Sequence, residues 1–343
     1  MLARDYNNKT QSQTDRLIIM KIGFVGLGNV GSKLAGSLLR NGYEVMVRDL
    51  NPDFVNDFVS RGARAADSPK QLAQTCDIVI TCLPSPAACS AVMEGTSDVE
   101  GVIAGLSEGK IWLEMSTTDE SEIRRIGALV EAKGAQPVDC PVSGGCHRAD
   151  TGNISIFAGC SRPAFERALP VLTTLGRRVL HTGELGTASK LKVVTNYLAT
   201  AHLVALGEAL TACKVMDLDM NVAYEAIKAS SGNSFVHETE SQVMLNGSRE
   251  INFTVDLVLK DVGLFNTLTQ REGMKLDLAP LLVDIFSQAQ DDFGPREKSP
   301  NIIRRYEEPM GVKVLGHGFP ADIVDDEPEE AGYELVAKGR QDY

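Results

Sequence analysis

The segment that most constrains the fold of this chain is residues 17–36, "LIIMKIGFVGLGNVGSKLAG". Its almost continuous apolar run predicts a strand buried on both faces, as in a parallel sheet. Gly26, Gly28 and Gly31 follow in G-x-G-x-x-G spacing, and the residues after them have the period of an amphipathic helix. A buried strand, a glycine turn and a helix in this order predict a dinucleotide-binding βαβ unit.

The glycine loop predicts where a dinucleotide would contact the chain. Gly26 permits a tight turn, Gly28 lets the backbone approach a pyrophosphate, and Gly31 lets the helix pack closely on the strand. The first amides of the helix, with its partial positive charge, then face the phosphates. The predicted cofactor contacts on this loop are Gly26, Leu27, Gly28, Asn29, Val30 and Gly31.

The end of the second predicted strand, "YEVMVRD", bears on which dinucleotide binds. Asp49 can accept hydrogen bonds from an adenosine ribose and would repel a 2′-phosphate. Arg48 and Lys33 leave the alternative open, because a basic group could hold that phosphate. The prediction is NAD, with NADP as the alternative.

Strand and helix alternate through the first half of the chain, which predicts a doubly wound parallel sheet, the Rossmann arrangement, over residues 20–183. The predicted strands after "YEVMVRD" are "DIVITCL", "KIWLEM", "QPVDCPV", "NISIFAG" and "RRVLH", and the helices are 52–61, 69–75 and 162–175. After Gly183 the period changes to 3.6, which predicts a second, all-α domain over residues 184–293. Its predicted helices are 187–216, 219–229, 236–246, 253–271 and 279–292.

The two ends of the chain differ from these domains in composition. Residues 1–19 read as a polar extension without the apolar core of a secretion signal. Residues 294–343 are charged, and "DDEPEE" at 325–330 is typical of a solvated or disordered acidic tail.

Charge and composition exclude several functions. The net charge of −12 argues against nucleic acid or an anionic membrane surface as the main partner. The apolar stretch near the start is interrupted by Lys21 and is too short to span a bilayer. Seven cysteines without a C-x-x-C pair, and five scattered histidines, predict free thiols in a reducing cytoplasm and no metal site.

The stretch "DCPVSGG", residues 139–145, ends a predicted strand of the sheet. Ligands of doubly wound sheets gather at the carboxyl ends of the strands. Ser143, Gly144 and Gly145 offer a hydroxyl and unobstructed backbone amides, which suit a carboxylate. An ordinary glycine turn is the alternative.

Two lysines lie two residues apart in the helix that opens the second domain. Residues at that spacing point roughly 200° away from each other, so Lys190 and Lys192 do not share a site easily. Lys192 shares a helix face with Asn196 and Thr195, whereas Lys190 neighbours only valines. Burial lowers the pKa of an ammonium, which would let Lys192 exchange a proton near neutral pH. Lys192 is therefore the candidate acid/base, and Lys190 is predicted to be solvated or at the nucleotide's edge.

These motifs together resemble the β-hydroxyacid dehydrogenase family, over about residues 21–292. The resemblance lies in "GFVGLGNVGSKLAGSL", "CLP" at 82–84, "ST" at 116–117, "DCPVSGG", "GELGTASKLKVVTN" and "LVLKDVGL". It implies reversible oxidation of a small β-hydroxy acid by NAD, with Lys192 as acid/base and Asn196 holding the substrate. It also implies that Leu83, Pro84 and Thr117 lie along the nicotinamide, that Lys260 reaches the cofactor or substrate, and that the chain forms a homodimer or homotetramer.

Some residues depart from the family pattern or remain ambiguous. Thr195, a candidate substrate contact, stands where the family has the first asparagine of a pair, and Ala188 replaces a glycine. His237 is a candidate wall of the substrate pocket, although a satisfied helix histidine is the alternative. The competing functions are an imine reductase, a sugar-phosphate dehydrogenase with Arg304 and Arg305 as a phosphate clamp, and a non-catalytic nucleotide-binding scaffold.

Overall fold

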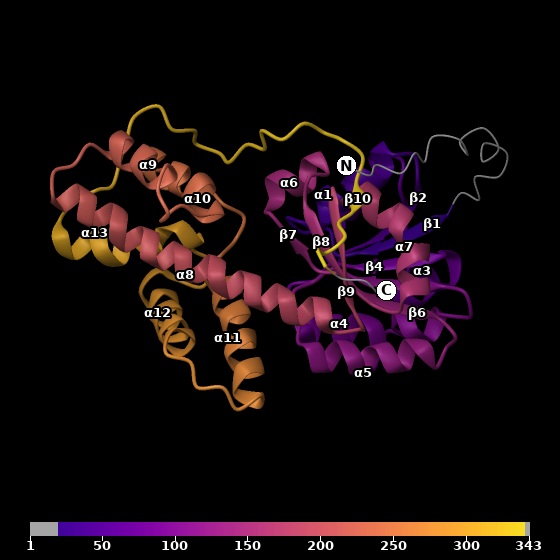
Figure 1. The fold of residues 1–343 in the computed structure, drawn as a ribbon. Helices are drawn as coiled ribbons and strands as arrows, with labels where there is room; N and C mark the ends of the chain where they lie inside the picture. Colours follow the sequence, from indigo (N-terminus) through magenta and orange to yellow (C-terminus); the bar gives the residue numbers. More distant parts are fainter. Residues whose placement is uncertain (1–19, 340–343) are drawn as a thin grey trace.

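The fold was obtained as a computed structural model that describes residues 20–339 (Figure 1). Its strands are β1 (Lys21–Val25), β2 (Glu44–Arg48), β3 (Arg64–Ala65), β4 (Ile78–Thr81), β5 (Ile111–Glu114), β6 (Gln136–Asp139), β7 (Val142–Ser143), β8 (Ser155–Gly159), β9 (Arg178–Gly183) and β10 (Tyr333–Glu334). They form one sheet in the order β10-β9-β8-β6-β5-β4-β1-β2-β3, with β7 paired to β8. The predicted polar extension, residues 1–19, lies outside the described residues.

The sheet is parallel except where β8 meets β6 and β7. Helices cover both of its faces: α1 (Gly31–Arg40), α2 (Pro52–Ser60), α3 (Pro69–Thr75), α4 (Pro86–Glu94), α5 (Glu120–Glu131), α6 (Cys146–Thr151) and α7 (Arg162–Leu175), with the 3₁₀ turn η1 (Val102–Gly105). Strands β4 and β5 are buried along their whole length, as a strand covered on both faces must be. The predicted doubly wound fold is confirmed. The stretch predicted as one strand over 136–142 is divided into β6 and β7.

The second domain is helical and begins directly after β9. Its elements are α8 (Thr187–Val215), α9 (Met220–Lys228), α10 (Phe235–Asn246), α11 (Val255–Arg271), α12 (Leu278–Phe293), η2 (Ser299–Ile303) and α13 (Arg304–Met310). By length and composition α8 could cross a membrane, with a mean hydropathy of 1.3 over its most apolar window. In the structure it packs against α10, α11 and β8, so its apolar residues contribute to a protein core.

The C-terminal segment differs from the predicted solvated or disordered tail. After α13 the chain crosses back to the first domain, where β10 pairs in parallel with β9 at the edge of the sheet (Figure 1, yellow). The acidic residues that suggested solvation pair instead with arginines of the first domain, among them Arg177 with Glu330 and Arg178 with Glu327. Composition indicated the charge of this segment correctly but not its partners.

Candidate active site

The glycine loop between β1 and α1 has the backbone that a dinucleotide site requires. A Cβ on Gly26, at φ +99°, would lie 2.2 Å from the Cys82 carbonyl oxygen, and one on Gly31 would lie 2.0 Å from the Gly26 carbonyl oxygen. A Cβ on Gly28 would meet nothing within 4 Å, so this glycine faces open space. Helix α1 has no side-chain cap, and Leu27, Asn29 and Val30 complete the loop that leads into it. The loop therefore fits a pyrophosphate at the N-terminus of α1.

Asp49 directly follows β2, beside this loop. Its carboxylate accepts a hydrogen bond from the Leu27 amide at 2.6 Å and another from the Asn51 amide at 2.8 Å. Arg48 is directed elsewhere, since its guanidinium donates to the carbonyl oxygens of Ala66 and Asp67. Lys33 pairs with Asp150 at 3.2 Å. A carboxylate thus lies at the loop while both basic residues that could hold a 2′-phosphate contact other groups.

The carboxyl ends of β4 and β5 place Leu83, Pro84 and Thr117 at the same edge of the sheet. The Leu83 amide donates to Ser116 Oγ at 2.7 Å, which ties the two strand ends together. Pro84 is exposed next to it. The Thr117 carbonyl oxygen accepts from Lys260 Nζ of α11 at 2.9 Å, so this edge is also joined to the second domain.

The loop of Ser143, Gly144 and Gly145 lies between β7 and α6. Gly144 has φ +129° and Gly145 has φ +88°, both in the region that favours glycine. Ser143 pairs with Ser155 of β8, which fixes the loop to the sheet. Successive amides in such a turn form a concavity that suits an anion.

Lys192 is buried on the inner face of α8, with 8% of its surface exposed. Its Nζ donates to Asn196 Oδ1 at 2.8 Å, the contact expected for residues four apart on a helix. Burial lowers the Lys192 pKa to about 8; nearby Asp261 raises it, and nearby Lys260 lowers it. A buried amine with this pKa can gain or lose a proton near neutral pH.

Asp261 of α11 was not among the residues predicted from the sequence. It accepts a hydrogen bond from Asn196 Nδ2, and its other oxygen is 2.8 Å from Lys260 Nζ. One connected polar chain therefore runs from Lys192 through Asn196 and Asp261 to Lys260, and it ends at Thr117 of the first domain. The only sequence signal for Asp261 was its place beside Lys260 in "LVLKDVGL".

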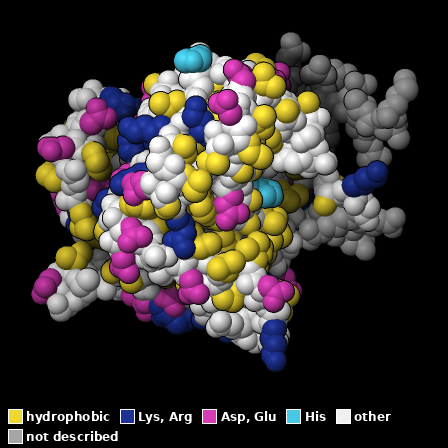
Figure 2. Space-filling view, turned by 90° about the vertical axis from the view of Figure 1, so that its left-hand side faces the viewer, with side chains coloured by type: hydrophobic (Ala, Val, Ile, Leu, Met, Phe, Trp, Pro, Cys, Tyr) yellow, Lys and Arg dark blue, Asp and Glu magenta, His cyan; other side chains and the backbone are white. Residues whose placement is uncertain are grey.

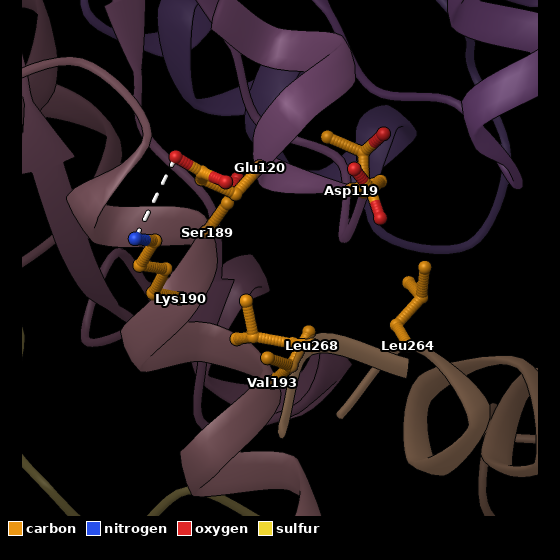
Figure 3. Close-up of a pocket in the computed structure, with 8 residues that line it drawn as sticks. Asp119, Glu120, Ser189, Lys190, Val193, Leu264 and Leu268 are labelled. Atoms are coloured by element: carbon orange, nitrogen blue, oxygen red, sulfur yellow. Dashed lines mark ion pairs between the residues drawn. The ribbon is translucent and has the colours of Figure 1, made fainter. Parts of the chain in front are cut away.

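Lys190 points away from this chain. Its Nζ lies 3.6 Å from Glu120, and 40% of its side chain is exposed. Figure 3 shows this pair in a small pocket between α5, α8 and α11, which Val193, Leu264 and Leu268 also line. Lys192 is not among the residues that line it. The two lysines thus separate as the helix geometry predicted.

Thr195 and His237 do not present their polar groups to Lys192 Nζ. The Thr195 hydroxyl donates to the Lys192 carbonyl oxygen at 2.9 Å, within its own helix. His237 is only 1% exposed, and its Nε2 is 3.0 Å from the Tyr224 carbonyl oxygen. Its ring also packs on Tyr224, at 4.8 Å between centroids. In this conformation His237 is a packing residue of the second domain, which is the alternative raised for it above.

The arginines considered as a phosphate clamp are bound to other side chains. Arg304 pairs with Glu308 and lies 4.4 Å over the Phe293 ring, and Arg305 donates to Gln288. These contacts hold both arginines on α13, within the second domain. The structure therefore gives the sugar-phosphate alternative no support.

A second residue that the sequence did not reveal is Asp139, at the end of β6. Its two oxygens accept from the Ser189 amide and hydroxyl, each at 2.7 Å, which anchors the first turn of α8. Burial raises its pKa to about 7, the hydrogen bonds from Ser189 oppose this, and nearby Glu114 adds to it. Asp139 thus positions the helix that carries Lys192.

Comparison with known proteins places both domains among nucleotide-binding dehydrogenases. The family model described as the NAD binding domain of 6-phosphogluconate dehydrogenase matches residues 21–183, and that described as NAD-binding of NADP-dependent 3-hydroxyisobutyrate dehydrogenase matches residues 186–306. The chain is 31% identical over 298 residues to 2-(hydroxymethyl)glutarate dehydrogenase of Eubacterium barkeri, covering 87% of this chain and 98% of the relative. It is 30% identical to mitochondrial 3-hydroxyisobutyrate dehydrogenase of Mus musculus, covering 71% and 74%.

A solved structure has the same architecture. The crystal structure of 3-hydroxyisobutyrate dehydrogenase from Salmonella typhimurium superposes with a TM-score of 0.76 at 27% identity, covering 83% of this chain and 99% of that one. The two nucleotide-binding models, the near-complete alignment with a dehydrogenase and this superposition agree with one another. The chain belongs to the β-hydroxyacid dehydrogenase family and is an NAD(P)-dependent oxidoreductase that interconverts a β-hydroxy acid and its carbonyl product.

Proposed function

We propose that Lys192 is the general acid/base of this oxidoreductase and that its substrate is a small β-hydroxy acid bound between the two domains. The proposal rests on one observation: the Lys192 side chain is buried, and its Nζ donates a hydrogen bond to Asn196. An ionisable group costs free energy to bury, and a perturbed pKa in a buried polar cluster is typical of a functional site.

The cofactor would be held by the glycine loop and by Asp49, Leu83, Pro84 and Thr117. The open space at Gly28 and the uncapped start of α1 fit its pyrophosphate. When bound, the nicotinamide supplies the hydride acceptor for oxidation and the hydride donor for reduction. Asp49 supports NAD rather than NADP, because its carboxylate would repel a 2′-phosphate.

Lys192 holds and moves the proton. In the oxidative direction its neutral amine accepts the proton of the substrate hydroxyl, and in the reductive direction its ammonium returns that proton. Both forms are populated near a pKa of about 8. Asn196 orients the amine through its carbonyl oxygen, and Asp261 in turn orients the Asn196 amide.

Ser143, Gly144 and Gly145 would bind the carboxylate of the substrate. This loop lies at the carboxyl end of the sheet, where ligands of such folds bind. Lys260 would act at the boundary with the cofactor, because it connects Asp261 to the Thr117 carbonyl oxygen. The relatives' names, which include 2-(hydroxymethyl)glutarate dehydrogenase and 3-hydroxyisobutyrate dehydrogenase, are consistent with a small hydroxy acid as substrate.

We also propose that the protein is a homodimer or homotetramer and acts in the cytoplasm. Leu191, Val194 and Leu198 are exposed at helical spacing on α8, and Val215 and Val222 are exposed near its far end. Figure 2, which views the second domain end-on, shows hydrophobic side chains among charged ones at this end of the molecule. A second copy could bury them. All seven cysteines are free thiols, as a reducing compartment maintains.

The experiment that tests this function is a steady-state screen of 3-hydroxyisobutyrate, glycerate, threonate, β-hydroxy-α-amino acids and 6-phosphogluconate with NAD and NADP. Turnover of a small β-hydroxy acid with NAD supports the proposal. Turnover of 6-phosphogluconate alone, or no turnover despite cofactor binding, contradicts it, and the latter favours the scaffold alternative.

A further inference from the structure

The C-terminal segment joins the two domains at a second point. The Ala321 carbonyl oxygen accepts from Ser248 Oγ of the second domain at 2.6 Å. Asp325 already accepts from Asn153 Nδ2 of the first domain at 2.7 Å. Only residues 322–324 separate these contacts, and the four Cα–Cα steps from Ala321 to Asp325 span at most about 15 Å. The crossing is therefore short, and Figure 1 shows it on the far side of the molecule from α11.

The acidic residues beyond this crossing converge on α6. Glu327 Oε1 accepts from Arg148 Nη2 at 2.9 Å, and its Oε2 accepts from Arg178 Nη2 of β9 at 2.9 Å. Asp325 lies 3.8 Å from Arg148 Nε and also accepts from Thr151 at the end of α6. One short acidic stretch thus binds the helix that directly follows the Ser143–Gly145 loop.

Arg148 contacts three separate parts of the molecule. A Cβ on Gly144 would lie 3.1 Å from Arg148 Cδ, so the aliphatic part of the arginine lies against the loop backbone. Its guanidinium is 4.9 Å from the centroid of the Phe235 ring on α10, in the second domain. Its third contact is with Asp325 and Glu327. With 21% of its side chain exposed, Arg148 is held on several sides at once.

This arrangement is an addition to the part of the chain that the family models describe. The second model ends at residue 306, whereas the crossing and the acidic contacts lie at 321–334. In this chain α8 connects the two domains, and the C-terminal segment returns to the first domain to close a second connection.

We propose that residues 312–339 form a strap between the domains and that Arg148 is a positioning residue. Asp325 and Glu327 of the strap hold Arg148 against Gly144. The Ser143–Gly145 loop thereby keeps the shape that binds the substrate carboxylate. The inference rests on the proposed function, in which this loop binds the carboxylate. Loosening the strap raises KM for the hydroxy acid while kcat and the affinity for NAD change little, because Arg148 contacts neither Lys192 nor the glycine loop.

The test uses isosteric, charge-removing variants of the full chain. Glu327→Gln removes the charge that Arg148 and Arg178 share. Glu329→Gln is its matched control, because Glu329 is exposed and makes no hydrogen bond or ion pair with the residues of the described range. Asp325→Asn and Asp326→Asn form a second pair of the same kind. Comparing Arg148→Met with Arg148→Lys then shows whether a cation at this position is enough to restore the KM for the hydroxy acid.

Two readouts are measured, KM and kcat for the hydroxy acid and hydrogen exchange of the amides at residues 143–151. We expect Glu327→Gln to raise KM for the hydroxy acid about fivefold or more and to change kcat by less than about twofold. We also expect faster hydrogen exchange at residues 143–151. Both effects follow from the loss of one to two charge-assisted hydrogen bonds that hold Arg148. Arg148→Met behaves in the same way, and Arg148→Lys recovers part of the affinity.

Hydrogen exchange separates this inference from the proposed function. If the wild type turns over no β-hydroxy acid, the proposed function fails, but faster exchange in Glu327→Gln than in Glu329→Gln still supports the strap. If the two glutamate variants match in exchange at 143–151, or match in KM while the wild type is active, the strap does not position this loop and the inference is overturned.

Discussion

Replacing Asp261 by asparagine shifts the pH at which Lys192 exchanges its proton. An asparagine retains an oxygen that can accept from the Asn196 amide, so the variant removes the charge and keeps the hydrogen bond. Asp261 raises the Lys192 pKa and Lys260 lowers it. Without the carboxylate, its attraction for the ammonium is lost while burial and Lys260 still disfavour the charge, so the pKa of Lys192 falls.

The magnitude follows from the geometry. Lys192 Nζ is 2.8 Å from Asn196 Oδ1, and the Asn196 amide then reaches Asp261. This path places the two charges roughly 7 Å apart, where they interact by about 2 kcal/mol at an effective dielectric constant of about 20. Since one pH unit corresponds to about 1.4 kcal/mol, the Lys192 pKa falls by about one to two units in Asp261→Asn.

The assay is kcat/KM for oxidation of the hydroxy acid between pH 5 and 10. Oxidation requires the neutral amine, so the rising limb of the profile, near pH 8 in the wild type, moves to lower pH in Asp261→Asn. Asp256→Asn is the control, because Asp256 lies on the same helix but pairs with Arg296 at the surface. A limb that stays in place, or moves to higher pH, refutes the assignment of this limb to Lys192.

Three further predictions concern the cofactor and stability. Asp49→Ser raises KM for NAD by about 10- to 150-fold and increases the ratio of NADP to NAD activity, since about 1.5–3 kcal/mol of charged hydrogen bonding is lost; steady-state kinetics with both cofactors measures this. Burial raises the Asp139 pKa to about 7, so its contribution to the free energy of unfolding is complete below about pH 4 and is lost as pH rises through 7. In the wild type the free energy of unfolding, measured by urea titration, therefore falls between pH 5 and 8, and in Asp139→Asn it falls less. If the pH dependence is the same in both proteins, the raised pKa of Asp139 is not its cause. Glu307→Ala leaves the buried Arg249 without its partner at 3.0 Å and lowers the free energy of unfolding by about 3–5 kcal/mol, whereas Glu308→Ala at the surface changes it by about 0–1 kcal/mol.

Local patterns in the sequence predicted the features that depend on local geometry. The glycine loop between β1 and α1, the start of α8 and the pairing of Lys192 with Asn196 follow from spacing along the chain. The bounds of α7 were predicted to the residue, because Ser161 caps its start and Pro163 follows. The helical second domain was predicted equally directly from its 3.6-residue period.

Features that depend on distant partners were not predicted. Asp261 meets Asn196 only because α11 packs on α8, and no spacing in the sequence records that contact. The acidic stretch at 325–330 was interpreted as solvated because its partners, among them Arg148 and Arg178, are scattered through the first domain. The role of His237 was uncertain for the same reason, since its burial against Tyr224 is set by how α9 and α10 pack.

A comparison of Lys192→Ala with Lys190→Ala tests whether Lys192 carries the proton. Calorimetry would measure NAD binding, and the appearance of NADH would measure turnover of the hydroxy acid. We expect Lys192→Ala to bind NAD normally but to lose about 10²–10⁴ in kcat, while Lys190→Ala, whose lysine pairs with Glu120, stays near wild type. Equal activity in the two variants would show that the proton is carried by another group.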